Sequence, residues 1–213
     1  MKLFWRVKGT MITILDYGLG NVGSISRMIQ KVGGKVFIAN SISDILRSDK
    51  LILPGVGKFD YGMMQLRNHG FVDPIVEIAM KGKIIFGICL GMQLLCNSSE
   101  EGDGFGLGLI DADVKKLPHQ NAAGEKCNIP NMGWSEISVL KDNMLFNTGN
   151  KSRFYFVHSY YVDLKCQNYS IATAKHSIDF CCSFQRGNIL GVQFHPEKSH
   201  RYGVQLFKNF VAA

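Results

Sequence analysis

The sequence predicts one α/β domain with a mostly parallel central sheet, helices on both of its faces, and added antiparallel strands. In the first half of the chain, short apolar runs typical of buried strands alternate with helix-like stretches, which is the pattern of a parallel sheet with helical crossovers. The second half carries shorter strand-like runs, which favour antiparallel additions to the same sheet. The chain has 213 residues and no linker or low-complexity segment, so its length suits one large domain.

The expected elements follow from the spacing of apolar residues. In the first half we expect strands at 12–15, 36–39, 50–53 and 84–88, and helices at 24–32, 59–68 and 73–80. In the second half we expect strands at 137–140, 154–157, 169–174, 180–185 and 189–194. An amphipathic stretch at 201–211 should close the domain as a helix. Residues 1–10 precede the first good strand, and we expect them to be a dispensable extension of a domain that spans 11–213.

The composition argues against several functional classes. No apolar stretch approaches the roughly 20 residues of a membrane helix, and the start does not resemble a signal peptide, so we expect a cytoplasmic protein with no membrane partner. The net charge is +7, but Lys and Arg are scattered, which favours a solvated surface over a nucleic-acid interface. The six cysteines form no C-x-x-C pair, so we expect free thiols and no zinc site.

One cysteine stands between an expected strand and an expected helix, with a glycine on either side. Cys89 follows the apolar run 84–88 and lies between Gly87 and Gly91, as in a G-x-S-x-G nucleophile elbow with sulfur in place of oxygen. A helix that begins at Leu90 would place N–H groups and its positive end beside the sulfur, which favours the thiolate. Although a lone buried cysteine is more often structural, this context predicts that Cys89 is a nucleophile.

A histidine and a glutamate two positions apart follow the last expected strand. Because alternate residues of a strand point to the same side, we expect His195 and Glu197 to share a face, with Pro196 marking the strand end. A carboxylate beside an imidazole fixes its tautomer and stabilises its cation. Cys89, His195 and Glu197 are therefore candidate catalytic residues, acting as nucleophile, base and orienter.

The segment 18–23 reads G-x-G-x-x-G between a strand and a helix, which is the pattern of a dinucleotide-binding loop. The second expected strand ends in Ala39 and Asn40, so it supplies no acidic residue to hold a ribose hydroxyl. We therefore favour a tight loop at the carboxyl edge of the sheet over a nucleotide site.

These motifs resemble those of the class I (triad) glutamine amidotransferases, and the resemblance extends over essentially the whole chain from Met11. The segments 87–93 and 195–197 match the two signatures of that family, and 16–21, 53–57, 132–134 and 195–199 are similar to its branch of imidazole glycerol phosphate synthase glutaminases. The resemblance implies a flavodoxin-like class I glutamine amidotransferase fold. It also implies hydrolysis of glutamine to glutamate and ammonia through a thioester on Cys89, without a cofactor or metal.

Further site residues are expected around this triad. The Leu90 amide follows the nucleophile and is a candidate oxyanion donor. The resemblance adds the loop of Gly55, Val56 and Gly57, after a peptide reorientation that a partner or ligand triggers. For glutamine binding, the resemblance implies Gln93, Glu101, His158, Ser159 and Tyr160.

A glutaminase of this kind is expected to need a partner, because free ammonia in neutral water is mostly ammonium and this chain has no room for an acceptor-activating domain. The resemblance implies a heterodimer with a (β/α)8-barrel cyclase that uses the ammonia to form imidazole glycerol phosphate and AICAR in histidine biosynthesis. The docking residues that it implies are Asn21, Lys58, Met132, Trp134 and Lys198.

Three departures from the expected pattern leave the acceptor of the ammonia open. Asn131, Ser135 and His200 stand where we expect His, Asn and Ser. With these residues, the sequence resembles paralogues that supply ammonia to a sugar amidotransferase in surface-polysaccharide synthesis. The sequence also leaves open a stand-alone hydrolase of γ-glutamyl compounds, which would share the triad but need no partner. A non-catalytic regulatory subunit is disfavoured, because no member of the triad is missing.

Overall fold

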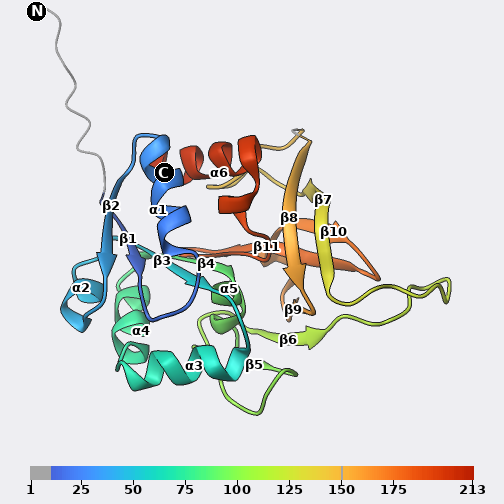
Figure 1. Ribbon diagram of the computed structural model, residues 1–213, viewed down its shortest axis with the longest axis horizontal. Coiled ribbons are helices and arrows are strands. Elements are labelled where there is room, and N and C mark those ends of the chain that lie inside the picture. Colours follow the sequence, from blue (N-terminus) through green and yellow to red (C-terminus); the bar gives the residue numbers. More distant parts are fainter. Residues whose placement is uncertain (1–10, 150) are drawn as a thin grey trace, which may run out of the picture.

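The computed structural model describes residues 11–149 and 151–213, so the prediction for residues 1–10 lies outside the described residues. Within the described part, twelve strands belong to one sheet (Figure 1). Its main path runs in the order β2-β1-β3-β4-β12-β11-β10-β7-β8. A parallel half and an antiparallel half therefore meet between β12 and β11.

The parallel half contains β1 (Met11–Leu15), β2 (Lys35–Ala39), β3 (Lys50–Gly55), β4 (Ile84–Cys89) and β12 (Ile189–Val192). Neighbours in this group all pair in parallel. Every residue of β3 is buried, as expected of a strand that is covered on both faces.

Helices cover both faces of the parallel half. The helices α1 (Val22–Lys31) and α6 (His200–Ala212) lie on one face, where Ile25, Ile29 and Phe207 share a core cluster. The other face carries α2 (Ile42–Leu46), α3 (Phe59–Asn68), α4 (Val72–Met80) and α5 (Leu90–Leu94). No helix in the described ranges has the length and apolarity needed to cross a membrane.

The antiparallel half extends from β12 through β11 (Asp179–Arg186), β10 (Ser170–Lys175), β7 (Asn131–Val139) and β8 (Ser152–His158). A branch of this half contains β9 (Tyr160–Leu164), β6 (Ala112–Lys116) and β5 (Ser98–Ser99). Two short 3-10 helices, η1 (Gln167–Tyr169) and η2 (Pro196–Lys198), complete the described elements.

The predicted fold class is confirmed, and each predicted strand and helix overlaps an observed element. The sequence interpretation missed α2, β5, β6 and β9. These elements are short, and β6 is a run of Ala112 to Lys116 in which only Ala112 and Val114 are buried, so no apolar run marks it. The predicted last strand is too long, since β12 ends at Val192.

Candidate active site

The cysteine predicted as nucleophile lies at a sharp corner between a strand and a helix. Cys89 is the last residue of β4, and α5 begins at Leu90, as predicted. Its φ of 54° lies in the left-handed region that side chains other than glycine rarely adopt. Backbone strain of this kind concentrates at functional sites, where the surrounding structure holds it in place. The residue is 7% exposed and lines a cavity.

Neighbouring backbone lies so close to Gly87 and Gly91, the two glycines near Cys89, that neither position has room for a side chain. A Cβ on Gly91 would lie 1.9 Å from the carbonyl oxygen of Leu53, and a Cβ on Gly87 would lie 2.6 Å from the carbonyl oxygen of Gly91. A side chain at Gly91 would therefore push β3 and α5 apart, and one at Gly87 would push β4 and α5 apart. The elbow geometry predicted from the sequence depends on both glycines.

His195 and Glu197 form a buried hydrogen-bonded pair. Their side chains are 2% and 1% exposed, and His195 Nδ1 lies 2.9 Å from Glu197 Oε1. The prediction that strand geometry brings them together is wrong, because Pro196–Lys198 form the 3-10 helix η2. The two side chains instead meet across this turn, for which His195 is the N-cap residue.

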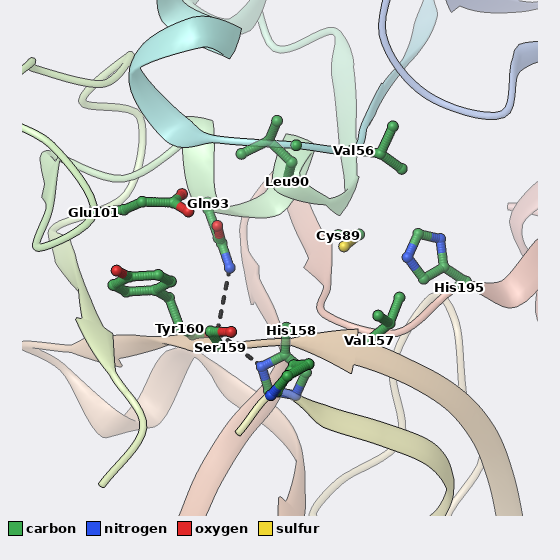
Figure 2. A pocket seen from close by; sticks show the side chains of 12 residues that line it. Val56, Cys89, Leu90, Gln93, Glu101, Val157, His158, Ser159, Tyr160 and His195 are labelled. Carbon is green, nitrogen blue, oxygen red and sulfur yellow. Dashed lines mark hydrogen bonds between the residues drawn. The ribbon is translucent and has the colours of Figure 1, made fainter. Parts of the chain in front are cut away.

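The environment of His195 favours the imidazolium. Burial lowers its pKa, but the interactions with Cys89 and Glu197 outweigh burial and raise the pKa of His195 from 6.5 to about 10. Glu197 engages Nδ1, whereas Nε2 has no hydrogen-bond partner among the described residues. The ring lies next to Cys89 (Figure 2), so Nε2 is the nitrogen available to exchange a proton at the sulfur.

Neighbouring side chains hold this pair in place. Asn21, predicted as a docking residue, donates from Nδ2 to Glu197 Oε1 at 3.3 Å. The hydroxyl of Ser199 donates to the carbonyl oxygen of His195 at 2.6 Å and accepts from the Tyr155 amide at 3.0 Å. The His195 amide also donates to the carbonyl oxygen of Tyr155 at 2.9 Å. These bonds attach the histidine to β8.

The loop predicted to supply an oxyanion donor begins directly beside Cys89. Gly55 is opposite Cys89 in the register of β3 and β4, and a Cβ on Gly55 would lie 2.8 Å from Leu90 Cβ. Val56 is 40% exposed, and Gly57 has a φ of 104° with open space around it. Val56, Gly57 and Leu90 line the same cavity as Cys89.

The G-x-G-x-x-G segment supports this loop. Gly20 packs so closely that a Cβ would lie 2.7 Å from Pro54 Cβ, and the hydroxyl of Tyr17 donates to the Pro54 carbonyl oxygen at 2.7 Å. A glycine is therefore needed here for contact between two loops at the carboxyl edge of the sheet. This packing fits the predicted tight loop.

The cavity beside Cys89 has a volume of about 340 Å³, within the range of small-molecule sites. It brings together predicted residues from five separate segments of the chain (Figure 2). The predicted residues that line it are Val56, Gly57, Cys89, Leu90, Gln93, Glu101, His158, Ser159, Tyr160 and His195. Pro130 and Val157 also line it and were not predicted, because nothing in the sequence marks their proximity to Cys89.

The predicted glutamine-binding residues are tied to the fold by hydrogen bonds. Gln93 and His158 both contact the carbonyl oxygen of Tyr160, at 3.3 and 2.8 Å. Burial lowers the pKa of His158 from 6.5 to about 4, so its ring is neutral at pH 7. Glu101 lines the cavity and also accepts from the Phe59 amide at 2.8 Å, which satisfies an N–H in the first turn of α3.

The other predicted docking residues are exposed. On β7, Met132 is 63% exposed and Trp134 is 39% exposed. Lys58 is exposed next to the loop of Val56 and Gly57, and Lys198 is exposed on η2. Trp134 stacks on His200 with ring centroids 5.5 Å apart. The two apolar side chains therefore lie on the surface and are free to contact another chain.

The sequence interpretation also missed Gln193, which is fully buried and whose side-chain amide lies 3.8 Å from the sulfur of Cys89. All six cysteines are free thiols. In residues 11–149 and 151–213, no group of His, Cys, Asp and Glu is arranged to hold a metal ion.

Comparison with known proteins identifies the family to which the chain belongs. The family model for class I glutamine amidotransferases matches residues 13–213. Among curated proteins, imidazole glycerol phosphate synthase subunit HisH 2 of Methanococcus maripaludis is 46% identical over 203 residues, which cover 94% of this chain and 98% of the relative. The subunit of the same name in Pseudomonas aeruginosa is 44% identical, with the same coverage.

Among solved structures, PurLQS from Thermotoga maritima superposes with a TM-score of 0.69, covering 96% of this chain and 98% of that chain at 19% identity. At 19% identity, this similarity shows that the two proteins share a fold.

Proposed function

Since this chain belongs to the class I glutamine amidotransferase family, and within it to the imidazole glycerol phosphate synthase subunits HisH, we propose that it hydrolyses L-glutamine and passes the ammonia to a partner subunit. The observation that carries the proposal is the cavity that Cys89 and His195 line together, with Glu197 hydrogen-bonded behind the histidine.

The first half of the reaction forms a thioester. The thiolate of Cys89 attacks the side-chain carboxamide carbon of glutamine, and negative charge develops on the amide oxygen. The backbone N–H of Leu90 and an N–H from the loop of Val56 and Gly57 stabilise this oxyanion. Protonated His195 gives its proton to the departing nitrogen, the C–N bond breaks, and ammonia leaves.

The second half regenerates the enzyme. Neutral His195 accepts a proton from a water molecule, whose oxygen attacks the thioester carbon. The C–S bond then breaks, Cys89 returns as thiolate, and glutamate leaves. Because its pKa is raised to about 10, His195 carries the proton at neutral pH, so it is ready for the first proton transfer.

The ammonia is passed to a (β/α)8-barrel cyclase, with which the chain forms a heterodimer. The exposed side chains of Met132 and Trp134 beside the cavity support this docking face, since aromatic residues and methionine are enriched in interface cores. The loop of Val56 and Gly57 lines the same cavity as Cys89, and a peptide reorientation there couples docking to oxyanion stabilisation. The cyclase uses the ammonia to form imidazole glycerol phosphate and AICAR in histidine biosynthesis.

A second acceptor is favoured by three residues near the docking face. Asn131 is bonded to His158, Ser135 lies on β7, and His200 stacks on Trp134. All three depart from the pattern expected for the histidine pathway, which supports a paralogue that feeds a sugar amidotransferase. Co-purification from the source cell distinguishes the two, because a cyclase of histidine synthesis and a sugar-modifying ligase are different proteins.

The test of the proposed chemistry is Cys89→Ala. We expect glutamate release, measured with the partner present, to fall at least about 1,000-fold, because no thioester can form. The binding of the partner should stay unchanged, since the alanine fits the elbow. Near wild-type turnover would contradict the proposal. Strong glutamine hydrolysis by the isolated wild-type chain would instead favour a stand-alone hydrolase, and no reaction of Cys89 with a glutamine-mimicking electrophile would favour a regulatory subunit.

A further inference from the structure

A buried glutamine that the proposed reaction does not use contacts the nucleophile. The register of β4 and β12 pairs Val192 with Ile88, so the next residue, Gln193, comes to lie beside Cys89. Its Nε2 is 3.8 Å from Cys89 Sγ, and the residue has no exposed surface. Water therefore does not compete for this contact.

Gln193 is one end of a continuous chain of hydrogen bonds that begins on strand β7. Asn131 Nδ2 lies 2.9 Å from His158 Nε2, and His158 Nδ1 lies 2.8 Å from the carbonyl oxygen of Tyr160. Figure 2 shows Gln93 and His158 both directed at Tyr160. Gln93 Nε2 contacts that carbonyl oxygen at 3.3 Å and Gln193 Oε1 at 3.0 Å.

The backbone carbonyl of Tyr160 fixes the donor and the acceptor of every hydrogen bond in this series. The Tyr160 oxygen can only accept, and its two lone pairs receive two donors. His158 must therefore present Nδ1–H, which leaves Nε2 as an acceptor for the Asn131 amide. Burial lowers the pKa of His158 to about 4, in agreement with this neutral tautomer.

On the other side of the carbonyl, the same logic orients both glutamines. Gln93 must present its NH2 group to Tyr160, and its second N–H is then directed at Gln193 Oε1. Because that oxygen accepts, the NH2 group of Gln193 must face Cys89. The group that reaches the sulfur is thus a hydrogen-bond donor.

We infer that Gln193 is a positioning residue that holds the Cys89 sulfur at the elbow and stabilises its thiolate through a buried N–H donor. A hydrogen bond to the charged form favours that form, and the fixed orientation of the amide means that no reorganisation is needed when the charge appears. This inference rests on the proposed role of Cys89 as nucleophile.

Two titratable groups besides the thiol face this point. His195 contacts Cys89 from the segment after β12, and Tyr17 lies near it from the loop after β1, where burial, and then the charge of Cys89, raise the pKa of the phenol. Neither group belongs to the series of hydrogen bonds that runs from Asn131 to Gln193. A change at Gln193 therefore alters one donor to the sulfur and leaves these two groups in place.

The test is Gln193→Met, which keeps the approximate length and volume of the side chain but removes the donor. The rate of Cys89 alkylation by iodoacetamide is followed from pH 5 to 9 with peptide-level mass spectrometry, because Cys127 and Cys166 are partly exposed and also react. We expect the pH midpoint of alkylation to rise by about one unit and the rate at pH 7 to fall about fivefold or more. Gln205→Met, on the exposed side of α6, is the matched control and should leave the profile unchanged.

The upper plateau of the alkylation profile separates positioning from damage to the fold. A plateau near the wild-type value shows an intact, accessible sulfur, so that the shifted midpoint reports the lost donor. An unchanged midpoint in a folded Gln193→Met variant would overturn the inference.

A second measurement needs no change at Gln193. The side-chain amide resonances of Gln193 in nitrogen-15 spectra of the wild-type chain should move as Cys89 titrates, and this movement should vanish in Cys89→Ala. Resonances that do not respond would also overturn the inference. Both measurements omit glutamine, so lost glutaminase activity with a normal Gln193 effect would contradict only the proposed function.

Discussion

Glu197 lies behind the histidine that faces Cys89, and one oxygen of its carboxylate takes part in two hydrogen bonds. His195 Nδ1 and Asn21 Nδ2 both contact Oε1, whereas Oε2 has no partner among the described residues. A buried carboxylate of this kind is stabilised chiefly by the imidazolium beside it. Together with Cys89, Glu197 therefore raises the pKa of His195.

Glu197→Gln tests this dependence. The amide keeps the shape but cannot stabilise the imidazolium, and it favours the wrong tautomer of His195, so we expect kcat with the partner present to fall by about 100-fold or more. Asn21→Ala keeps the carboxylate and removes one of its bonds, so a fall of about tenfold or less is expected. Equal losses in the two variants, or no loss in Glu197→Gln, would contradict the assigned roles.

The strand-to-helix elbow is an element that depends on backbone contact rather than on side-chain packing. Leu53 in β3, Cys89 in β4 and Gly91 in α5 are held together so closely that one added carbon at Gly91 would lie 1.9 Å from a carbonyl oxygen. The partly exposed loop that follows β3 has more freedom, since Gly57 has open space around it.

Gly91→Ala and Gly57→Ala separate crowding from backbone strain. We expect Gly91→Ala to lower the free energy of unfolding by about 3 kcal/mol or more, because β3 and α5 must move apart. Gly57→Ala, strained at its φ of 104° but unobstructed, should cost about 1 kcal/mol. Urea unfolding measures both. A loss at Gly57 as large as that at Gly91 would mean that crowding is not the dominant effect at the elbow.

Strand β8 ends in a buried histidine whose titration should affect the acid stability of the fold. The pKa of His158 is lowered by burial from 6.5 to about 4, so the unfolded chain binds this proton at a higher pH than the folded chain does. The contribution of His158 to stability is therefore fully present above about pH 6.5, and it is lost as the pH falls towards 4. Urea unfolding between pH 4.5 and 7 should show this loss.

His158→Gln provides the control for this titration. The variant is expected to be less stable at pH 7, but its free energy of unfolding should fall less steeply over the same pH range. If the free energy of unfolding falls equally steeply with pH in wild type and variant, groups other than His158 dominate the loss of stability at low pH.

At the scale of the whole molecule, the active site opens beside an exposed apolar surface. Met132 and Trp134 alternate along β7 with less exposed residues, and the same strand contributes buried Asn131 to the chain of hydrogen bonds that ends at Cys89. A partner that contacts β7 would therefore meet a strand that hydrogen bonds connect to Cys89.

Trp134→Ala and Met132→Ala should weaken binding of the synthase partner, each by about tenfold or more if these side chains are buried in the complex. Titration calorimetry with the purified partner measures the effect. Phe105→Ser is the control, since Phe105 is 76% exposed on the loop after β5, outside the proposed docking face. An equal loss in this control, or unchanged affinity in both β7 variants, would contradict the proposed docking face.

The sequence could predict what depends on local pattern. Alternating apolar runs and helix-like stretches gave the α/β class and most elements, and the glycines around Cys89 gave the elbow, because a sharp strand-to-helix turn is specified within a few residues. Short elements such as α2 and β9 were missed, since their formation depends on pairing with distant segments. The turn at Pro196–Lys198 was mistaken for a strand end for the same reason.

By itself, the sequence determined the family of this protein and its candidate catalytic groups: a thiol at an elbow, an imidazole and a carboxylate, in the order of the class I glutamine amidotransferases. Only the tertiary structure decided which groups surround that thiol. The parallel pairing of β4 with β12 brings Gln193 to Cys89, and the close contact of Gly20 with Pro54 makes the G-x-G-x-x-G segment a support for the loop of Gly55, Val56 and Gly57. Such contacts follow from strand register and close backbone approach, which join residues far apart in the chain and leave no local pattern in the sequence.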